Sequence, residues 1–358
     1  MNQENRIIAL DRHYRQVWNQ AKARAAALDG RPARALAKEA YGPNGERLYY
    51  EPTVTDVHVD GPLTNLSVMY KNESYIGDQL FPFFPVSKKS DVYFVYNHGD
   101  FFRDEVKPRA TGSPARDTGY TVATSNYNCV TRALATVIPD EVMENADSPL
   151  QPRQDAVAFL TERFMISREL RIANLVCSIT NVGSGINLTG TNQWSDLGNS
   201  DPVSVVTTGN AFTRLLTGRR PNTLIVGAEV HDILLMHPDI IERIKYTARA
   251  DQATIRSAIA DIFGVQNYLV ADAVYNPQPA GATDSFANIW GKNAVLAYVN
   301  GSPGLRSITA GLTFAFISRQ MRSGREDRNR LTWTEMEEST DERIIDRNCI
   351  YTITNAVA

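Results

Sequence analysis

The sequence predicts an α+β protein with more than one lobe, and three patterns support this class. Two strand-like runs flank a charged segment that contains Pro and Gly within residues 75–135. One long helical run follows residue 151, and residues 205–318 then alternate short strands with helices. The chain has 358 residues, of which 43% are hydrophobic and 22% are charged, so it is long enough for about two domains.

Composition argues against several classes of protein. No run approaches the roughly 18 apolar residues of a membrane-spanning helix, and the first residues lack the apolar core of a signal peptide. A formal net charge of -3 argues against a protein that binds nucleic acid over its whole surface, so any contact with DNA is expected to be local. Cys129, Cys177 and Cys349 are far apart and are expected to be buried reduced thiols.

Residues 1–40 form a basic segment, with eight Lys and Arg residues against four Asp and Glu residues. Its alanine-rich stretch favours a helix but lacks a strong apolar stripe. Such a segment can lie against a polyanion, wrap a neighbouring subunit, or remain a solvated helix. Residues 41–74 contain several Gly and Pro residues and are expected to be an extended linker.

The run 91–96 is a predicted strand, and a second run from Gly119 to Ile138 is expected to return beside it. Both faces of the first strand are apolar, with Val92, Phe94 and Tyr96 on one face and Tyr93 and Val95 on the other. An isolated hairpin is marginally stable in water, and exposed apolar area usually marks an interaction site. The hairpin therefore either covers another subunit or belongs to the chain's own sheet.

A helix of about seven turns is predicted from residue 151 to residue 177. Its expected buried stripe consists of Phe159, Ile166, Leu170, Ala173 and Cys177, while Arg163, Arg168 and Arg171 are expected to face water. Because the average helix has about three turns, this one is predicted to act as a spine across the molecule.

The second half of the chain predicts a buried sheet with helices. The expected strands of this sheet are 223–226, 268–270, 294–299 and 312–317. Pro238 is predicted to break the helix after the first strand, and Gly264 is predicted to cap a later one. The tail 319–347 is densely charged with both signs, and a last strand is predicted at 349–353.

Patterns typical of catalytic and metal sites are weak. The glycines within 183–190 lack dinucleotide spacing, and no phosphate-binding Gly-Lys-Ser/Thr motif occurs. His231 and His237 lie six residues apart on a broken helix, which is poor spacing for one metal ion. His98 lies in a predicted turn. We therefore expect a protein that is not an enzyme and that has no cofactor and no metal site.

Three blocks of the sequence resemble the major capsid proteins of tailed bacteriophages. The blocks are Tyr75–Pro82 continued by Tyr93–Tyr96 and Gly99–Arg103, then Asn222–Gly227 with His237–Tyr246, and finally Ile262–Val265 with Val270–Asn276. These are packing motifs without chemistry, so the resemblance rests on their order and spacing across about residues 60–358.

The resemblance implies a shell fold in four parts. These are an N-terminal arm and linker at 1–74, an extended β-hairpin loop region at 75–135, a peripheral domain with the spine helix at 136–204 plus 319–358, and an axial α/β domain at 205–318. It also implies assembly into hexamers and pentamers of an icosahedral shell around double-stranded DNA. Scaffolding and portal proteins are implied partners, a decoration protein is an optional one, and no membrane is involved. The protein would be made in the cytoplasm of a host bacterium and end in the virion.

The expected functional site is then a surface between subunits. The hairpin is predicted to lie over the adjacent subunit, and charged residues of the tail are predicted to pair across the contact. Exposed ion pairs contribute only about 0 to 1 kcal/mol each, so many weak contacts must act together. The candidate residues are Tyr93, Phe94, Tyr96, Phe101, Phe102, Arg103, Lys107, Arg325, Arg328, Arg330, Glu337 and Glu338.

Two alternatives remain open from the sequence. One is the shell protein of a cellular nanocompartment with the same fold, which encloses cargo enzymes in place of a genome. The other is a cytoplasmic α/β enzyme, supported only by the strand and helix alternation of residues 205–318. That enzyme would need a pocket with converging polar groups.

Overall fold

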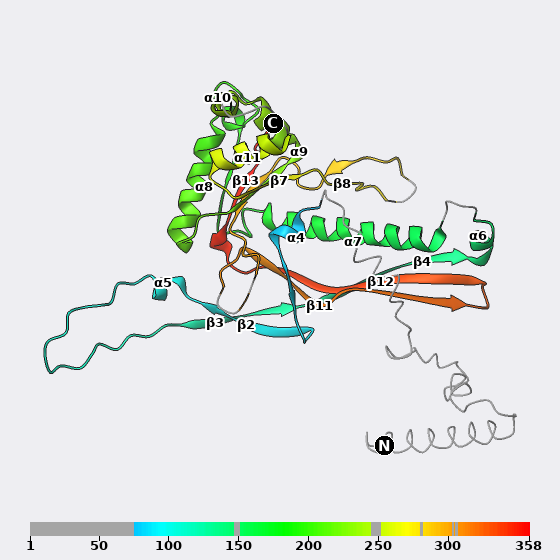
Figure 1. The fold of residues 1–358 in the computed structure, drawn as a ribbon, viewed down its shortest axis with the longest axis horizontal. Helices are drawn as coiled ribbons and strands as arrows, with labels where there is room; N and C mark the ends of the chain where they lie inside the picture. The colour runs from blue at the N-terminus through cyan, green and yellow to red at the C-terminus, as the bar shows by residue number, and fades with distance from the viewer. Residues whose placement is uncertain (1–74, 147–150, 245–251, 280–281, 303, 305–306) are drawn as a thin grey trace, which may run out of the picture. The chain divides into compact units, whose positions relative to one another are not determined.

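The computed structural model describes residues 75–146, 151–244, 252–279, 282–302, 304 and 307–358 (Figure 1). These residues all belong to one compact unit. The predicted basic arm and linker, residues 1–74, lie outside the described residues. The described part of the chain contains two larger sheets, one helix of 25 residues, several shorter helices and a protruding two-stranded ribbon.

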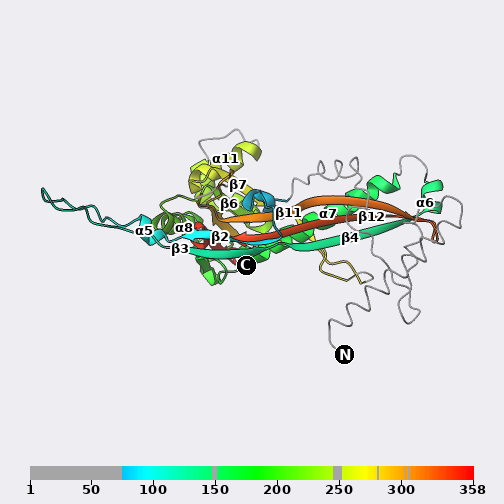
Figure 2. The same ribbon diagram turned by 90° about the horizontal axis from the view of Figure 1, so that it is seen from below.

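The first sheet has four strands and carries the long helix α7 (Pro152–Val176). Its strands, in spatial order, are β1 (Phe83–Pro85), β11 (Gly311–Glu326), β12 (Leu331–Ile344) and β4 (Val130–Pro139). Figures 1 and 2 show α7 running along the three long strands. Met321 and Met336 are cross-strand partners, and they form a buried cluster with Val157, Leu160 and Phe164 of α7.

The second sheet has five strands and is covered on both faces. Its strands, in spatial order, are β5 (Ser184–Asn187), β13 (Ile350–Thr354), β10 (Ala294–Ala297), β6 (Thr223–Gly227) and β7 (Asn267–Ala271). Leu224 and Val226 of β6 pack into one core, whereas Ile225 between them packs into another. This alternation is what a strand buried on both faces requires.

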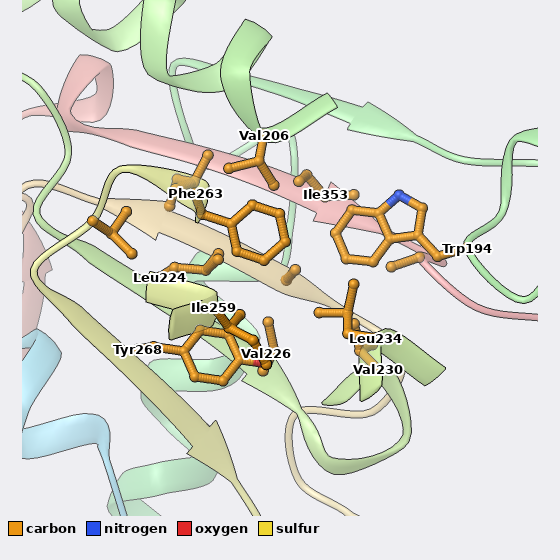
Figure 3. Packing of buried hydrophobic residues seen from close by; sticks show 14 of the residues in the cluster. Trp194, Val206, Leu224, Val226, Val230, Leu234, Ile259, Phe263, Tyr268 and Ile353 are labelled. Carbon is orange, nitrogen blue, oxygen red and sulfur yellow. The ribbon is translucent and has the colours of Figure 1, made fainter. Parts of the chain in front are cut away.

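Helices α8 to α11 supply the cover for the first of these cores. They are α8 (Pro202–Thr217), α9 (Ala228–Met236), α10 (Pro238–Ile244) and α11 (Gln252–Phe263). Figure 3 shows Trp194, Val206, Phe263 and Leu234 closing over the strand residues. The predicted break at Pro238 is confirmed, and Gly264 ends α11 with a φ of 68°, a left-handed conformation that favours glycine.

The long helix joins both sheets, as a spine would. Its first half packs on the four-stranded sheet, and Ile172 and Val176 of its second half pack into the core beneath the five-stranded sheet. The predicted stripe is partly wrong, because Phe159 is exposed while Leu160 and Arg168 are buried. The arginine was expected to face water, but acidic partners from other elements compensate its charge inside the protein.

The two sheets also divide the chain differently from the sequence prediction. The strand expected at 312–317 is part of β11 and lies in the four-stranded sheet, not in the α/β sheet. Conversely, the C-terminal strand β13 and the early strand β5 lie in the five-stranded sheet. The charged tail forms most of the β11–β12 hairpin, because its alternating residues leave every second side chain facing α7 or the core.

The predicted return run divides into two strands with different partners. Strand β3 (Val122–Asn128) pairs antiparallel with β2 (Ser90–Tyr96), and after Cys129 the chain continues as β4 of the four-stranded sheet. The remaining short elements are α4 (Gly77–Leu80), α5 (His98–Phe101), α6 (Asp140–Glu144), η2 (Gly190–Asn192), β8 (Val274–Tyr275), β9 (Ala287–Asn288) and η3 (Arg347–Cys349).

Candidate subunit interface

One face of the β2–β3 ribbon is anchored on the chain's own sheet. Tyr127 stacks on Phe314 of β11 with ring centroids 4.6 Å apart, and Tyr93 lies 5.5 Å from the same ring. The two tyrosines therefore fix the ribbon to the four-stranded sheet. Tyr93 was predicted to contact another subunit, and its partly exposed ring packs against this chain's own Phe314.

The opposite face of the ribbon carries exposed apolar side chains. Val92 is 57% exposed and Phe94 is 68% exposed. Their cross-strand partners are the polar residues Asn126 and Thr124, which provide little apolar cover. Strands β2 and β3 pair only with each other among the described strands. The ribbon therefore presents an apolar surface that the described part of its own chain leaves open.

A small aromatic cluster closes the far end of the ribbon. Tyr96, Phe101 and Tyr120 pack with ring centroids 5.9 to 6.0 Å apart. Asp100 accepts hydrogen bonds from the backbone N–H of Thr121 at 2.8 Å and from its hydroxyl at 2.6 Å. These bonds lower the pKa of Asp100 and tie the two ends of the loop together. Tyr96 and Phe101 thus shape the loop base, although the Phe101 ring stays exposed.

The loop base also contacts the body of the molecule. His98 Nε2 lies 3.1 Å from Asp346 Oδ2, and Asp346 in turn caps η3 by accepting from the Asn348 N–H at 3.0 Å. Phe102 lies beside Gly218, where an added Cβ would come within 3.1 Å of its ring. The predicted turn at His98 is a short helix, and its imidazole helps to position the loop.

Beyond this base, the segment 103–119 has no helix or strand. Arg103 and Lys107 are exposed there, and Val106 is 92% exposed. A long irregular loop with apolar and basic side chains on a rigid ribbon is typical of a binding element. The predicted site residues of the loop are therefore accessible to a partner.

The charged tip of the β11–β12 hairpin is paired mostly within the chain. Arg325 binds Asp140 at 2.7 Å and Asp327 at 2.9 Å, and Arg322 binds Glu337 at 2.7 Å. Two further predicted residues, Arg328 and Arg330, are exposed on the hairpin turn, and Arg330 has a φ of 49°. The predicted pairing of Glu337 and Arg325 across subunits would thus compete with pairs inside this chain.

Glu338 does not belong to the surface at all, which corrects the prediction for this residue. It is 0% exposed and binds Arg168 at 2.6 Å and Arg171 at 3.1 Å. Arg168 also binds Asp78, and Arg171 also binds Glu342 at 2.7 Å. Glu338 and Met336 lie two positions apart on β12, so their side chains are on the same face of the sheet. This is the face that α7 covers, because Met336 packs against residues of that helix.

This buried network shifts the pKa values of Arg168 and Glu342. Burial alone would lower the pKa of Arg168, but the charges of Glu338 and Asp78 outweigh burial and raise it. Burial would raise the pKa of Glu342, but Arg171 outweighs that effect and lowers it. The network joins α7, β12 and α4, and the sequence analysis missed it because Arg168 and Arg171 were expected to face water.

Glu169 is a second buried residue that the sequence analysis missed. Its carboxylate accepts hydrogen bonds from the Ile76 and Gly77 N–H groups and from Trp290 Nε1, the last at 2.6 Å. Burial raises the pKa of Glu169 against these hydrogen bonds. The residue thereby ties α4, and the strand β1 that follows it, to the spine helix.

The histidines considered as metal ligands lie apart and have protein partners. His231 Nδ1 lies 2.8 Å from the Tyr268 hydroxyl, whereas His237 Nε2 lies 3.1 Å from the Ser200 hydroxyl. No group of three or more possible metal ligands occurs among the residues that the structure describes. Within the same residues, no helix is long and apolar enough to cross a membrane. The three cysteines are free thiols, and Cys129 and Cys349 are buried as predicted, whereas Cys177 is partly exposed.

The fold, with its spine helix on a long-stranded sheet, separate α/β sheet and protruding ribbon, is shared with several solved structures. A phage-related protein from Bordetella bronchiseptica RB50 shares this fold with a TM-score of 0.67 at 21% identity, over 84% of this chain and 98% of that one. The capsid of cyanophage P-SCSP1u gives 0.54 at 12% identity, over 91% and 98%. The mature capsid of bacteriophage PhiM1 gives 0.51 at 11% identity, over 88% and 95%.

Sequence relatives agree with the fold. The major capsid protein of Burkholderia phage BcepMu is 32% identical over 247 residues, which cover 67% of this chain and 76% of the relative. The major capsid protein of Pseudomonas phage JBD67 is 24% identical over 242 residues, covering 67% and 77%. No family model matches the chain. The chain belongs to the major capsid protein family of tailed phages and forms the capsid shell.

Proposed function

We propose that this chain builds an icosahedral shell of hexamers and pentamers around the double-stranded DNA of a tailed phage. The observation that supports this assembly mode most directly is the β2–β3 ribbon, whose outer apolar face is open while its inner face is anchored on Phe314. An adjacent subunit is the proposed cover for Val92, Phe94 and the loop 103–119. The mature protein would then reside in the virion after synthesis in the bacterial host.

The free energy of one ribbon contact is small enough for a misplaced subunit to dissociate during assembly of the shell. Full burial of one Val or Phe side chain contributes about 1.5 to 3 kcal/mol, and part of that is lost to ordering of the loop. A single ribbon contact is therefore reversible. Each subunit of a closed shell makes such a contact with its neighbours, so the assembled particle is stable through many weak contacts.

The other proposed partners act on different surfaces. A scaffolding protein and a portal protein would set the size of the shell and its unique vertex, and a decoration protein is an optional outer partner. The packaged DNA would lie against the inner face. These assignments rest on membership of the family, and the ribbon argument does not depend on them.

The test is a pair of substitutions at one exposed position. Phe94→Asp puts a charge into the proposed contact, whereas Phe94→Leu keeps an apolar side chain of similar size. We expect both variants to keep the thermal unfolding midpoint of the unassembled protein, because Phe94 has little cover in the chain itself. Phe94→Asp should abolish shells in sedimentation and negative-stain electron microscopy, and Phe94→Leu should retain them. Normal shells from Phe94→Asp would refute the ribbon as an interface.

A further inference from the structure

The side chains on the face of the β11–β12 hairpin that meets α7 change from apolar to polar toward the hairpin tip. Cross-strand pairs on this face are Met321 with Met336, Ser323 with Thr334, and Arg325 with Thr332. The methionine pair packs under Val157 and Leu160 of the helix. Toward the hairpin tip, hydroxyl groups and an arginine replace the apolar side chains, at the level where α7 begins.

A cavity of about 140 Å³ lies at this change. Its lining consists of Arg153, Ser323, Gly324, Arg325, Thr332 and Thr334. A water molecule occupies about 30 Å³ of liquid volume, so the space suits one small polyatomic group and is too small for a nucleotide. The lining carries two arginines and no carboxylate, which favours an anion over a cation.

Thr334 supplies an observation independent of the arginines. The residue is 1% exposed, and its hydroxyl has no hydrogen-bond partner among the residues that the structure describes. A buried hydroxyl without a partner is costly, and such groups in native proteins usually serve a ligand or an ordered water. Thr334 is also one of the residues that line the cavity, and the side chains of the other lining residues are mainly hydrogen-bond donors.

The arginines are available in different ways. Arg153 is exposed in the first turn of α7 and has no ion pair with any described residue. Arg325 donates hydrogen bonds from Nε to Asp327 and from Nη2 to Asp140. No described hydrogen bond uses its Nη1 group. The two aspartates hold the guanidinium in place beside the cavity and leave one edge of its fork open.

The N-terminus of α7 adds to the positive electrostatic potential of the two arginines. The helix has 25 residues, Pro152 begins it, and the Gln151 side chain does not cap its N–H groups. An uncapped helix N-terminus carries a partial positive charge and favours anions. This feature would not define a site alone, and here it coincides with the two arginines and the unpartnered Thr334 hydroxyl.

We propose that this cavity binds a small free oxyanion of the phosphate or sulfate class. The anion would accept hydrogen bonds from Arg153, from the open edge of Arg325 and from Thr334. It would join the first turn of α7 to the tip of the β11–β12 hairpin. The proposal concerns a ligand site within one subunit and is independent of the proposed assembly mode.

The test measures thermal unfolding of the purified full-length chain in inorganic phosphate and in sodium chloride at equal ionic strength. Phosphate should raise the wild-type midpoint saturably, because a ligand that binds only the folded state stabilises it. Arg153→Gln should weaken the apparent phosphate affinity about tenfold, since it removes a charge-assisted hydrogen bond. Arg328→Gln, an exposed arginine on the same hairpin that does not line the cavity, should leave the phosphate response unchanged.

Thr334→Val gives a readout that general loss of stability cannot imitate. The variant has nearly the same shape and removes the unpartnered hydroxyl, so the midpoint in chloride should rise while the phosphate response falls. Equal midpoints in phosphate and chloride for the wild-type protein would overturn the proposal. So would a wild-type phosphate response in both Arg153→Gln and Thr334→Val, because the anion would then bind elsewhere.

Discussion

Glu169 Oε2 accepts a hydrogen bond of 2.7 Å from the backbone N–H of Gly77, a residue 92 positions earlier in the chain. The contact is possible because Gly77 has no side chain, since an added Cβ would lie 2.7 Å from the carboxylate oxygen and 2.9 Å from Ile172 Cδ1. A buried carboxylate in the spine helix thus holds the segment that leads into β1. Both residues must keep their identity for this junction to close.

The first prediction concerns that junction. Gly77→Ala should destabilise the chain by about 1 to 3 kcal/mol, because the new methyl group overpacks a buried site. Glu169→Gln should cost about 1 to 3 kcal/mol, because one carboxamide oxygen cannot replace two carboxylate oxygens and a buried N–H loses its acceptor. Urea unfolding of the unassembled protein measures both. Gly119→Ala is the matched control, since an added Cβ there meets nothing within 4 Å, and an equal loss in the control would contradict the prediction.

A second prediction concerns the buried ion pair between Arg168 of α7 and Glu338 of β12. Glu338→Ala should cost about 3 to 5 kcal/mol, because it leaves the charge of Arg168 buried with one acidic partner fewer. The control is Arg343→Ala, which breaks a more exposed pair with Asp341 at 2.8 Å and should cost about 0 to 1 kcal/mol. Similar unfolding free energies for the two variants would show that Glu338 is not an internal structural charge.

The same network predicts a loss of stability in acid. The folded pKa of Glu342 is lowered, so its contribution is present above the ordinary glutamate pKa of about 4.3 and is lost as the pH falls through the folded value. The stability advantage of the wild type over Glu342→Gln should therefore be constant near neutral pH and shrink below about pH 4.3. Urea midpoints across this range measure it, with Glu144→Gln as the control for loss of an exposed carboxylate. A constant advantage down to strongly acidic pH would contradict the assigned direction.

The sequence predicted elements that depend on local chemistry. The spine helix, the break at Pro238 and the left-handed cap at Gly264 each follow from a few neighbouring residues. It did not predict which sheet each strand joins, because β11 pairs with β1 and β13 pairs with β5, and both partners lie far away in the chain. It placed Arg168 in water and Glu338 at a contact between subunits, because the pair that buries both charges joins residues 170 positions apart.

The site shows the same division. Strand alternation and turn signals, which are local properties, led to the prediction of Phe94, Arg103 and Lys107 as interface residues, and all three are exposed. That Tyr93 packs on Phe314 was not predicted, because the sequence does not say which face of the ribbon meets the chain's own sheet. A strand with two apolar faces leaves that choice open, and the tertiary contact decides it.

The last prediction concerns the loop 103–119 before and after assembly. Arg103, Arg109 and Arg116 are exposed in a segment without helix or strand, so trypsin should cut there in the unassembled chain before it cuts the described helices and strands. Lys107 precedes a proline and should resist cleavage.

If neighbours cover the ribbon and loop in the shell, assembled particles should be protected at these three bonds, and mass spectrometry of the first fragments measures the change. Phe94→Asp, held under assembly conditions, is the matched control and should remain cleavable. Equal cleavage of the loop in intact shells and in unassembled protein would show that the loop faces solvent in the particle and would remove it from the proposed interface.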